Sequence, residues 1–417
     1  MELKLKPAHI KRYTDIAWLL IKHGRSDLVK HAGLDQALKT RQLTASETEP
    51  KAEELALDLE KMGPTFIKLG QLLSTRPGLL PVSYLKSLIR LQDRVEPFPY
   101  QEVETIIAAE LGVRISKAFS EFDPKPIAAA SLGQVHRARL RDGTPVAVKV
   151  QRPGIDAQIV EDLDILMQVA DIVDNRTQLG ERFEFQKMLE EFRRSLMREL
   201  DYKQEARNLK TLGANLADFR LIVVPSPIED FTTSHVLTME YIRGRKITSL
   251  SPLAILGLDG AQLAEELFRA YLKQILVDGF FHADPHPGNL FLTDDGRIAL
   301  VDLGMVGRVS PYLQEKLLHF MRAIGEGRSE DAANLAMEIG EKKEKFDTDG
   351  FRQGIAQLTD ELNVQQLEVG TAIMEFAQVA GDSGLRLPSE LTMLAKTLMN
   401  LDEVARTLNP DEIHNKG

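Results

Sequence analysis

The sequence predicts an α+β fold, in which helical segments precede and follow a short strand-rich segment. Residues 1–119 and 311–410 have a mostly helical character. Near residue 125 the pattern changes from helical to strand-like. The segment 127–139 is followed by the turn pair Asp142-Gly143 and by the apolar run Pro145–Val150, which is typical of a β-hairpin.

The other elements follow in order along the chain. Charged segments with apolar residues on one face favour helices, whereas short apolar runs bounded by glycine or proline favour strands. The expected helices cover about 101–119, 155–175, 183–212 and 260–278, the expected strands are Leu221–Pro225 and His235–Tyr241, and Phe280–Leu303 is expected to be loop with short strands.

The composition is that of a globular protein. The 417 residues include 62 acidic and 52 basic side chains, which gives a net charge of −10, and 43% of the residues are apolar. This excludes a wholly disordered chain, and the acidic balance disfavours a nucleic-acid partner. The sequence has no cysteine, which excludes disulfides, thiolate metal sites and a cysteine nucleophile. No apolar run reaches the roughly 18 residues of a membrane-spanning helix.

The segment HADPHPGNLF, from His282 to Phe291, carries the strongest chemical signal. Asn289 comes five residues after Asp284, and Asp302 follows in the segment VDLG. Protein kinases space a catalytic aspartate, an asparagine and a metal-binding aspartate in this way. Magnesium, which accompanies ATP phosphates, prefers oxygen ligands, and Asn289 and Asp302 can supply them. Asp284 is then the catalytic carboxylate that orients an attacking hydroxyl or water.

Two other interpretations of this segment stay open on its residues alone. The prolines and the glycine of HADPHPGN are also typical of a surface turn. His282 and His286 could instead indicate a zinc site. We favour the kinase-like interpretation because two independent signals, a strand lysine and a small-residue loop, occur in the order that it requires.

The second signal is Lys149, which ends the apolar segment VAVK on the return strand of the predicted hairpin. In protein kinases a lysine at this place holds the α- and β-phosphates of ATP. A strand would keep the ammonium group fixed as a point charge over the phosphates. By itself, a lysine at the end of a strand is also compatible with a solvated surface residue.

The third signal is the loop before this strand, where protein kinases have the glycine-rich segment GxGxxGxV. Glycine lets the backbone approach phosphate closely, whereas alanine restricts it, so this loop is predicted to be stiffer and to hold nucleotide differently. Alone, the stretch also allows a helix or a tight packing contact. The loop residues assigned to ATP are Ile127, Ala128, Ala129, Ala130, Ser131, Leu132, Gly133, Gln134 and Val135.

The fourth signal is Glu205, in the segment RELDYKQEARNL. An active kinase lysine needs a carboxylate partner on a helix. Asp201 and Glu205 lie at i and i+4, hence on one helix face, whereas Glu199 lies off that face. Glu161 and Asp162 are nearer to the nucleotide lysine in sequence and stay open as alternatives, as does a solvated helix.

The segment KLGQ places Lys68 and Gln71 on one helix face between apolar flanks. A narrow polar stripe on an apolar helix indicates that the stripe faces a polar site. On the residues alone, a surface lysine on an amphipathic helix is the simpler interpretation.

The segment VLTMEYIRG is an apolar strand that ends at Glu240 and Ile242 before a glycine. It fits the hinge between two kinase lobes, where the backbone of Glu240 and Ile242 would meet the edge of adenine. A plain core strand is the alternative.

Taken together, these motifs resemble the UbiB-like family of atypical kinases, the coenzyme Q biosynthesis group. The resemblance extends from about residue 60 to 410 and rests on the ensemble, since each single motif is a weak signal. The segments that carry it are KLGQ (Lys68–Gln71), STRPGLLP (Ser74–Pro81), LQDRVEPF (Leu91–Phe98), AAASLGQVHRA (Ala128–Ala138), VAVKVQRPG (Val146–Gly154), ELDYKQEA (Glu199–Ala206), HADPHPGN (His282–Asn289) and DLG (Asp302–Gly304).

The resemblance implies a protein-kinase-like bilobal fold with a helical N-terminal extension and a mainly helical C-terminal lobe. The extension is expected over residues 1–120, an N-lobe with a helical insert over 121–242, and the C-lobe over 243–417. In the family the KxGQ helix folds over the active site, which puts Lys68 near the phosphates as a catalytic residue. Glu205 matches the family's partner of the nucleotide lysine. The residues that match the regulatory KxGQ and ExD motifs are Lys68, Gly70, Gln71, Glu199 and Asp201.

The resemblance also implies activity and partners. Family members bind adenine nucleotide with magnesium, act as ATPases and support ubiquinone or related prenyl-lipid production at a membrane. ATP or ADP and Mg²⁺ are therefore the expected cofactors. The expected partners are a lipid or membrane surface and isoprenoid-quinone biosynthesis proteins, and the oligomeric state stays open. We expect a cytoplasmic protein without a transmembrane segment, and peripheral contact with the inner membrane stays open.

The segment after Asp302 separates this chain from conventional protein kinases. After DLG only MVGRVSPYLQEKLL precedes a helix, and no APE-type segment follows at a suitable distance. A small-molecule or lipid kinase would use the same nucleotide residues and stays open as an alternative. A nucleotide-binding pseudokinase scaffold is a third hypothesis, and the presence of Lys149, Asp284, Asn289 and Asp302 argues against it.

Overall fold

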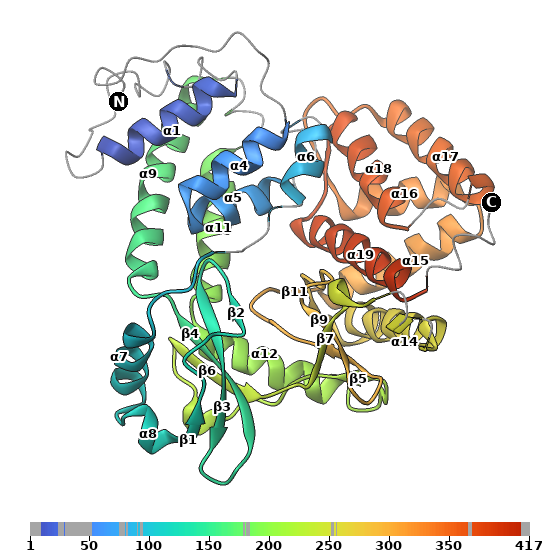
Figure 1. The fold of residues 1–417 in the computed structure, drawn as a ribbon. Coiled ribbons are helices and arrows are strands. Elements are labelled where there is room, and N and C mark those ends of the chain that lie inside the picture. Colours follow the sequence, from blue (N-terminus) through green and yellow to red (C-terminus); the bar gives the residue numbers. More distant parts are fainter. Residues whose placement is uncertain are drawn as a thin grey trace. The chain divides into compact units, whose positions relative to one another are not determined.

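The structure is a computed structural model that describes residues 10–23, 29, 52–74, 80, 82–89, 91, 95–177, 180, 184–251, 254–255, 257–365 and 369–409 (Figure 1). Parts of the segments 74–81 and 91–98 thus lie outside the described residues. The chain divides into two compact units. The first is Met1–Ile115, Asp123–His136 and Lys149–Asp201, and the second is Ser116–Phe122, Arg137–Val148 and Tyr202–Gly417. The expected domain boundaries at 120 and 242 stay a prediction.

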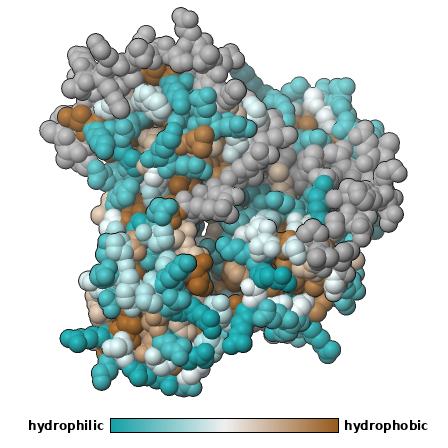
Figure 2. All heavy atoms as spheres, in the orientation of Figure 1, coloured by the Kyte–Doolittle hydropathy of each residue, from teal (hydrophilic) through white to brown (hydrophobic). Residues whose placement is uncertain are grey.

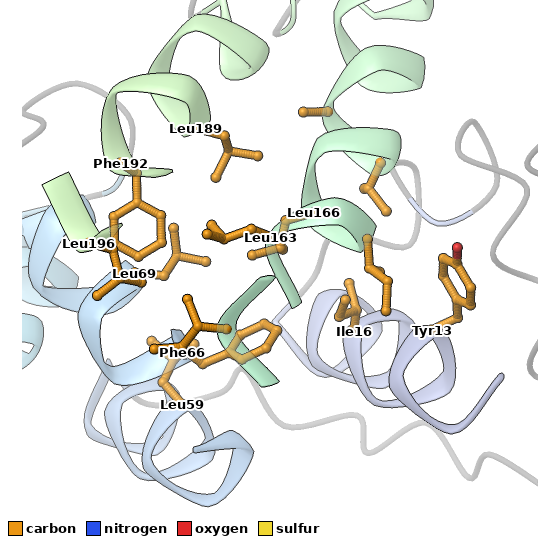
Figure 3. Close-up of a cluster of buried hydrophobic side chains, with 14 of the residues drawn as sticks. Tyr13, Ile16, Leu59, Phe66, Leu69, Leu163, Leu166, Leu189, Phe192 and Leu196 are labelled. Atoms are coloured by element: carbon orange, nitrogen blue, oxygen red, sulfur yellow. The ribbon is translucent and has the colours of Figure 1, made fainter. Parts of the chain in front are cut away.

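The first unit is mainly helical where the structure describes it. Figure 3 shows part of its core, in which side chains from different helices meet, such as Ile16, Leu59, Phe66, Leu163 and Phe192. Each of these side chains is at most 5% exposed, and burial of one contributes about 1.5–3 kcal/mol. The helices are α1 (Ile10–Lys22), α4 (Ala52–Met62), α5 (Pro64–Ser74), α6 (Val82–Ile89), α7 (Tyr100–Leu111), α9 (Ile155–Arg176) and α11 (Phe185–Glu199).

A five-stranded sheet contains the predicted hairpin, which is confirmed as β3 (Gly133–Leu140) and β4 (Pro145–Gln151). The amide of Leu140 donates to the carbonyl of Thr144 over 2.9 Å, and Gly143 takes a φ of +90°, which glycine adopts without strain. The strand order is β1-β3-β4-β6, and β2 pairs with β3. The other strands are β1 (Phe119–Phe122), β2 (Ala128–Ala129) and β6 (Val236–Glu240).

The second unit combines a four-stranded sheet, of order β5-β10-β9-β7, with helices. Its other strand pairs are β8 with β11 and β12 with β13. The strands are β5 (Ile222–Val223), β7 (Gly244–Lys246), β8 (Phe280–His282), β9 (Leu290–Thr293), β10 (Ile298–Leu300), β11 (Val306–Arg308), β12 (Glu341–Lys342) and β13 (Leu385–Arg386). The helices are α8 (Ile115–Ala118), which begins at the last residue of a first-unit segment, α12 (Tyr202–Asn215), α14 (Gly260–Lys273), α15 (Pro311–Gly325), α16 (Ser329–Ile339), α17 (Thr348–Gln365), α18 (Val369–Asp382) and α19 (Ser389–Leu408).

Two predicted helices are wrong in their continuity. The helix expected over 183–212 is two helices, α11 and α12, because the amide of Tyr202 donates to the carbonyl of Ser234 over 3.0 Å instead of continuing α11. Asp201 therefore precedes α12 and does not share a helix face with Glu205. The helix expected over 101–119 ends at Leu111, where Gly112 takes the left-handed conformation, and only α8 follows.

Hydrophilic side chains predominate on the face shown in Figure 2, and hydrophobic ones are scattered over it. Among the described residues, none of the helices combines the length and the hydropathy that crossing a bilayer requires.

Candidate functional site

The strongest sequence motif forms a compact loop and hairpin in the second unit. Strands β9 and β10 pair with Leu290 opposite Leu300, and the amide of Val301 donates to the carbonyl of Asn289 over 3.1 Å. Because the strands are antiparallel, Asn289, the residue before β9, lies beside the end of β10, and Asp302 follows two residues after that end. The segment Phe280–Leu303, expected to be loop with short strands, thus contains the strand β10 just before Asp302.

Asp302 is held in an unusual backbone conformation. It is an exposed residue whose φ is +62°, and apart from Glu184 it is the only non-glycine residue with a positive φ in the described part of the chain. Such a conformation costs energy and persists where the surroundings enforce it, often at functional sites. Asn208 on α12 supplies one restraint, since its Nδ2 donates to the carbonyl of Leu303 over 2.9 Å inside the protein. Asn208 belongs to no recognisable motif, so the sequence does not single it out.

Asp284 lies between β8 and the Asn289 turn. β8 pairs with β11, and the amide of Ala283 donates to the carbonyl of Met305 over 3.1 Å, which brings the loop beside the segment after Asp302. The Nδ2 of Asn289 donates to the carbonyl of Asp284 over 3.2 Å. The structure therefore links Asp284 to Asn289 directly and places both near the end of β10.

The chemistry of this donor set fits magnesium. With its nitrogen bonded to Asp284, the Asn289 amide has its oxygen Oδ1 left to act as a metal ligand, and Asp302 adds an exposed carboxylate. Magnesium is commonly held by one or two protein oxygens together with substrate phosphates and water. Within the described ranges, no group of three or more histidine, cysteine, aspartate or glutamate side chains is placed to hold a metal.

His282 is a structural residue at the base of the loop. It is 0% exposed, and its backbone amide donates to Oε1 of Gln274 over 3.0 Å. Burial lowers the pKa of its imidazole to about 4, although Asp284 and Asp302 oppose that shift. The imidazole is therefore neutral at neutral pH and adds no positive charge to the site.

The chain after Asp302 folds back at once. β11 pairs with β8, and α15 begins at Pro311 with the Ser310 hydroxyl accepting from the amide of Leu313. This is the short connection that the sequence predicts. The described residues between Gly304 and Pro311 leave no room for a long activation segment, the part of protein kinases that supports a peptide substrate.

Helix α19 reaches the loop from the far end of the chain. Nζ of Lys396 lies 3.0 Å from Oδ1 of Asp284, and Nδ2 of Asn400 donates to the same oxygen over 3.4 Å. Thr397, between them on the helix, donates its hydroxyl to the carbonyl of Ala283 over 3.0 Å. The sequence gives no signal for these contacts, because the three residues belong to an ordinary amphipathic helix.

In the first unit, Lys68 on α5 forms an ion pair with Glu199 at the end of α11. Both side chains are largely buried, at 11% and 17% exposure, which excludes a solvated surface lysine. Gly70 lies against neighbouring leucines, and an added Cβ would come within 2.4 Å of Leu91 Cδ1. Glycine thus permits the close packing of α5, while Gln71 donates to the carbonyl of Leu91 over 3.4 Å.

The alanine-rich loop is a tight turn, and its stiffness stays a prediction. Ala128 and Ala129 in β2 pair with the start of β3, and the amide of Ala130 donates to the carbonyl of Gly133 over 2.8 Å. At the tip, Leu132 is 5% exposed within the helical core of the first unit. Ser131 is fully buried, and its hydroxyl has no hydrogen-bond partner among the described residues. Ile127, at the start of the loop, is half exposed.

Gln134 and His136, which follow this turn on β3, form buried hydrogen bonds. The Gln134 side chain accepts from the amide of Phe98 over 2.9 Å and donates to its carbonyl over 3.2 Å. His136 contacts Gln134 through Nε2 over 3.0 Å and the carbonyl of Asp123 through Nδ1 over 2.8 Å. Because a carbonyl only accepts, Nδ1 carries the proton and Nε2 accepts from Gln134. The side chain of Gln134 is thus occupied by hydrogen bonds to Phe98 and His136.

This network predicts that the first unit loses stability in acid. Burial lowers the pKa of His136 below its ordinary 6.5, so the folded form binds the proton less readily than the unfolded chain. The contribution of the neutral His136 side chain to the folding stability is therefore complete above pH 6.5, and it declines as the pH falls below that value. Urea unfolding at pH 7.5 and pH 5.5 should show a smaller pH effect in His136→Gln than in wild type. An equal effect in both proteins would contradict the assignment.

The remaining predicted residues lie in both units. Lys149 is half-buried on β4 in the first unit, whereas Glu205 on α12 in the second is 2% exposed. Their ion pair stays a prediction. At the end of β6, the amide of Glu240 donates to the carbonyl of Ser226 over 2.8 Å, and Ile242 follows half-buried. The backbone role of Glu240 and Ile242 at adenine also stays a prediction.

Asp162, one of the alternative partners for the lysine, has a different role. Its carboxylate receives both Nε and Nη2 of Arg12, each over 2.5 Å, and the hydroxyl of Thr65 over 2.6 Å. Asp162 is 2% exposed. These contacts connect α1 and α5 to α9, so the carboxylate of Asp162 has a structural role inside the helical first unit.

Comparison with known proteins identifies the family. The profile of the ABC1 atypical kinase-like domain matches residues 90–336, and the UbiB helical domain matches residues 355–412. An uncharacterized protein of Synechocystis sp. is 37% identical over 365 residues, which are 87% of this chain and 62% of that protein. A protein of Marinobacter nauticus named probable protein kinase UbiB is 33% identical over 419 residues, which are 96% of this chain and 76% of that protein.

A solved structure shares the fold. The complex of Rv3197 with erythromycin from Mycobacterium tuberculosis has a TM-score of 0.57 and 22% identity, and the match covers 92% of this chain and 95% of that one. The predicted α+β kinase-like fold is therefore confirmed, with its helical N-terminal and C-terminal parts. The chain belongs to the ABC1/UbiB family of atypical kinase-like proteins.

Proposed function

We propose that this protein is a magnesium-dependent ATPase of the atypical kinase type that supports ubiquinone or other isoprenoid-quinone biosynthesis. The observation that carries the proposal is the link between Asn289 and Asp284 beside Asp302, whose backbone is held in a left-handed conformation. The positive φ of Asp302 costs energy, and backbone strain of this kind is typically retained at functional sites.

In this proposal each residue has a stated task. Asp302 and Asn289 hold magnesium, which neutralises charge on the phosphates when bound. Lys149 holds the α- and β-phosphates, and Glu205 positions that lysine. Asp284 orients a water whose oxygen attacks the γ-phosphorus as the bond to the bridging oxygen breaks and ADP leaves.

The loop from Ile127 to Val135 is assigned to the phosphates. The unpartnered buried hydroxyl of Ser131 supports this, because a buried donor without a partner is costly and a phosphate oxygen would satisfy it. The backbone carbonyl of Glu240 and the amide of Ile242 are assigned to adenine. Lys68, paired with Glu199, is assigned to the regulatory motif near the phosphates, together with Gly70, Gln71 and Asp201.

Water as acceptor is supported by the short connection between Gly304 and α15, which offers no platform for a peptide. Transfer to a lipid or small phenol is the second candidate, and the name probable protein kinase given to the Marinobacter relative favours transfer. The family resemblance is the basis for assigning the protein to isoprenoid-quinone biosynthesis. It is also the basis for proposing a lipid surface and quinone-biosynthesis proteins as partners, and contact with the inner membrane from the cytoplasm.

The test is ADP release from magnesium-ATP, with and without anionic liposomes and a small phenol. Lys149→Ala should weaken ATP binding or turnover by about 10–100-fold, since one charge-assisted contact contributes about 1.5–3 kcal/mol. The exposed Lys125, replaced by Ala in the same way, is the matched control and should behave as wild type. Phosphorylated lipid formed at the rate of ADP release would indicate transfer. Nucleotide binding without ADP release under any condition would overturn the ATPase and favour a scaffold.

A further inference from the structure

Helix α19 contacts the catalytic loop at two successive residues. Lys396 and Asn400 lie at i and i+4, hence on one face of the helix, and both approach Oδ1 of Asp284. Thr397 is fully buried and donates to the carbonyl of the preceding residue, Ala283. This is one helical surface that holds one loop, with a cation, an amide and a hydroxyl.

The loop has no permanent cation of its own. Between Asp284 and Asn289 it contains two prolines, a glycine and His286, and the ring Nδ1 of His286 accepts from the amide of Gly288 over 3.1 Å. A carboxylate that must orient an attacking oxygen next to phosphates needs a restraint, because phosphates repel it. Lys396 is a cation that the structure places against it.

The Lys396–Asp284 pair is protected enough to act as a restraint. The two side chains are 14% and 19% exposed, and their atoms are 3.0 Å apart. An ion pair away from bulk water is less screened than a surface pair, and a charge-assisted hydrogen bond is roughly twice as strong as a neutral one. Both α19 donors meet the same carboxylate oxygen, Oδ1, so they restrain the carboxylate from one side.

We infer that Lys396 is a positioning residue of the active site, which orients the Asp284 carboxylate for the acceptor. The inference rests on the proposed function. It makes the UbiB helical domain, which contains α19, a part of the catalytic machinery and not only an appended helical layer. Asn400 and Thr397 support the same geometry without charge.

The test compares Lys396→Met with Lys396→Arg in the full chain. A misplaced catalytic group typically costs about 100-fold, so Lys396→Met should lower kcat for ADP release by about 10–100-fold, with KM for ATP changed less than about twofold. Lys396→Arg keeps the charge and should recover most of kcat. Lys316 pairs with Glu338 on other helices, so Lys316→Met is the matched control and should have the wild-type kcat. Wild-type kcat in Lys396→Met, or an Arg variant as slow as the Met variant, would overturn the inference.

A second readout does not depend on turnover. Asp284→Asn, Lys396→Met and the double variant are unfolded in urea. Because both single changes break the same pair, the shift of the midpoint in the double variant should be smaller than the sum of the single shifts. Additive shifts would overturn the inference. If wild type releases no ADP, the proposed ATPase fails, and these midpoints still decide whether Lys396 holds Asp284.

Discussion

Replacing Asp302 by asparagine is expected to lower magnesium-dependent ATP turnover by about 10²–10³-fold, the range for losing one electrostatic group in an active site. The change keeps the shape of the side chain and removes its negative charge. The αL backbone at Asp302 suits asparagine as well as aspartate, so the fold and the hairpin should persist. The loss should therefore appear as weaker magnesium dependence of ADP release, and not as a lower urea midpoint.

Asp295 provides the matched control for this variant. It lies in the turn of the same hairpin, is 58% exposed in its side chain, and pairs with Arg297. Asp295→Asn makes the same chemical change a few residues away and should leave turnover within about twofold of wild type, because surface ion pairs contribute little. Wild-type turnover in Asp302→Asn would remove the metal assignment. An equal loss in both variants would indicate damage to the hairpin.

Replacing Asp162 by alanine is expected to reduce the unfolding free energy of the first unit by about 3 kcal/mol. Removing one partner of a buried pair costs about 3–5 kcal/mol, and the 18% exposure of Arg12 places this case at the lower end. The change also leaves the hydroxyl of Thr65, which is fully buried, without its acceptor. Urea unfolding monitored by far-ultraviolet circular dichroism measures the loss.

Asp164, two residues along the same helix, is the control for that experiment. Its side chain is 53% exposed and lies 3.3 Å from Arg193, which is itself 45% exposed. Asp164→Ala should cost less than about 1 kcal/mol, as is usual for exposed pairs. Equal losses in the two variants would show that Asp162 is not the buried anchor of α1. If the Asp162→Ala variant stays folded but loses nucleotide binding, the alternative hypothesis that Asp162 is the partner of Lys149 would be favoured instead.

Much of the candidate site follows from the sequence because its parts are local. Asp284, Asn289 and Asp302 lie on one loop and one short hairpin, so their spacing nearly fixes their proximity. The hairpin of β3 and β4 was equally predictable, since a turn pair and two apolar runs define it. The break between α11 and α12 was not, because Tyr202 is drawn out of the helix by the distant carbonyl of Ser234.

The kinase-like motif set, the family and most of the order of helices and strands follow from the sequence alone. The anchoring of α1 by Asp162, the pair of Lys68 with Glu199 and the contact of Lys396 with Asp284 are visible only in the folded chain. The difference lies in the sequence separation of the partners. Hydrogen bonds within a turn or hairpin depend on neighbouring residues, whereas these ion pairs join residues more than a hundred positions apart. Their partners are set by how helices pack on a shared core, and an amphipathic pattern specifies the buried face of each helix but not its neighbour.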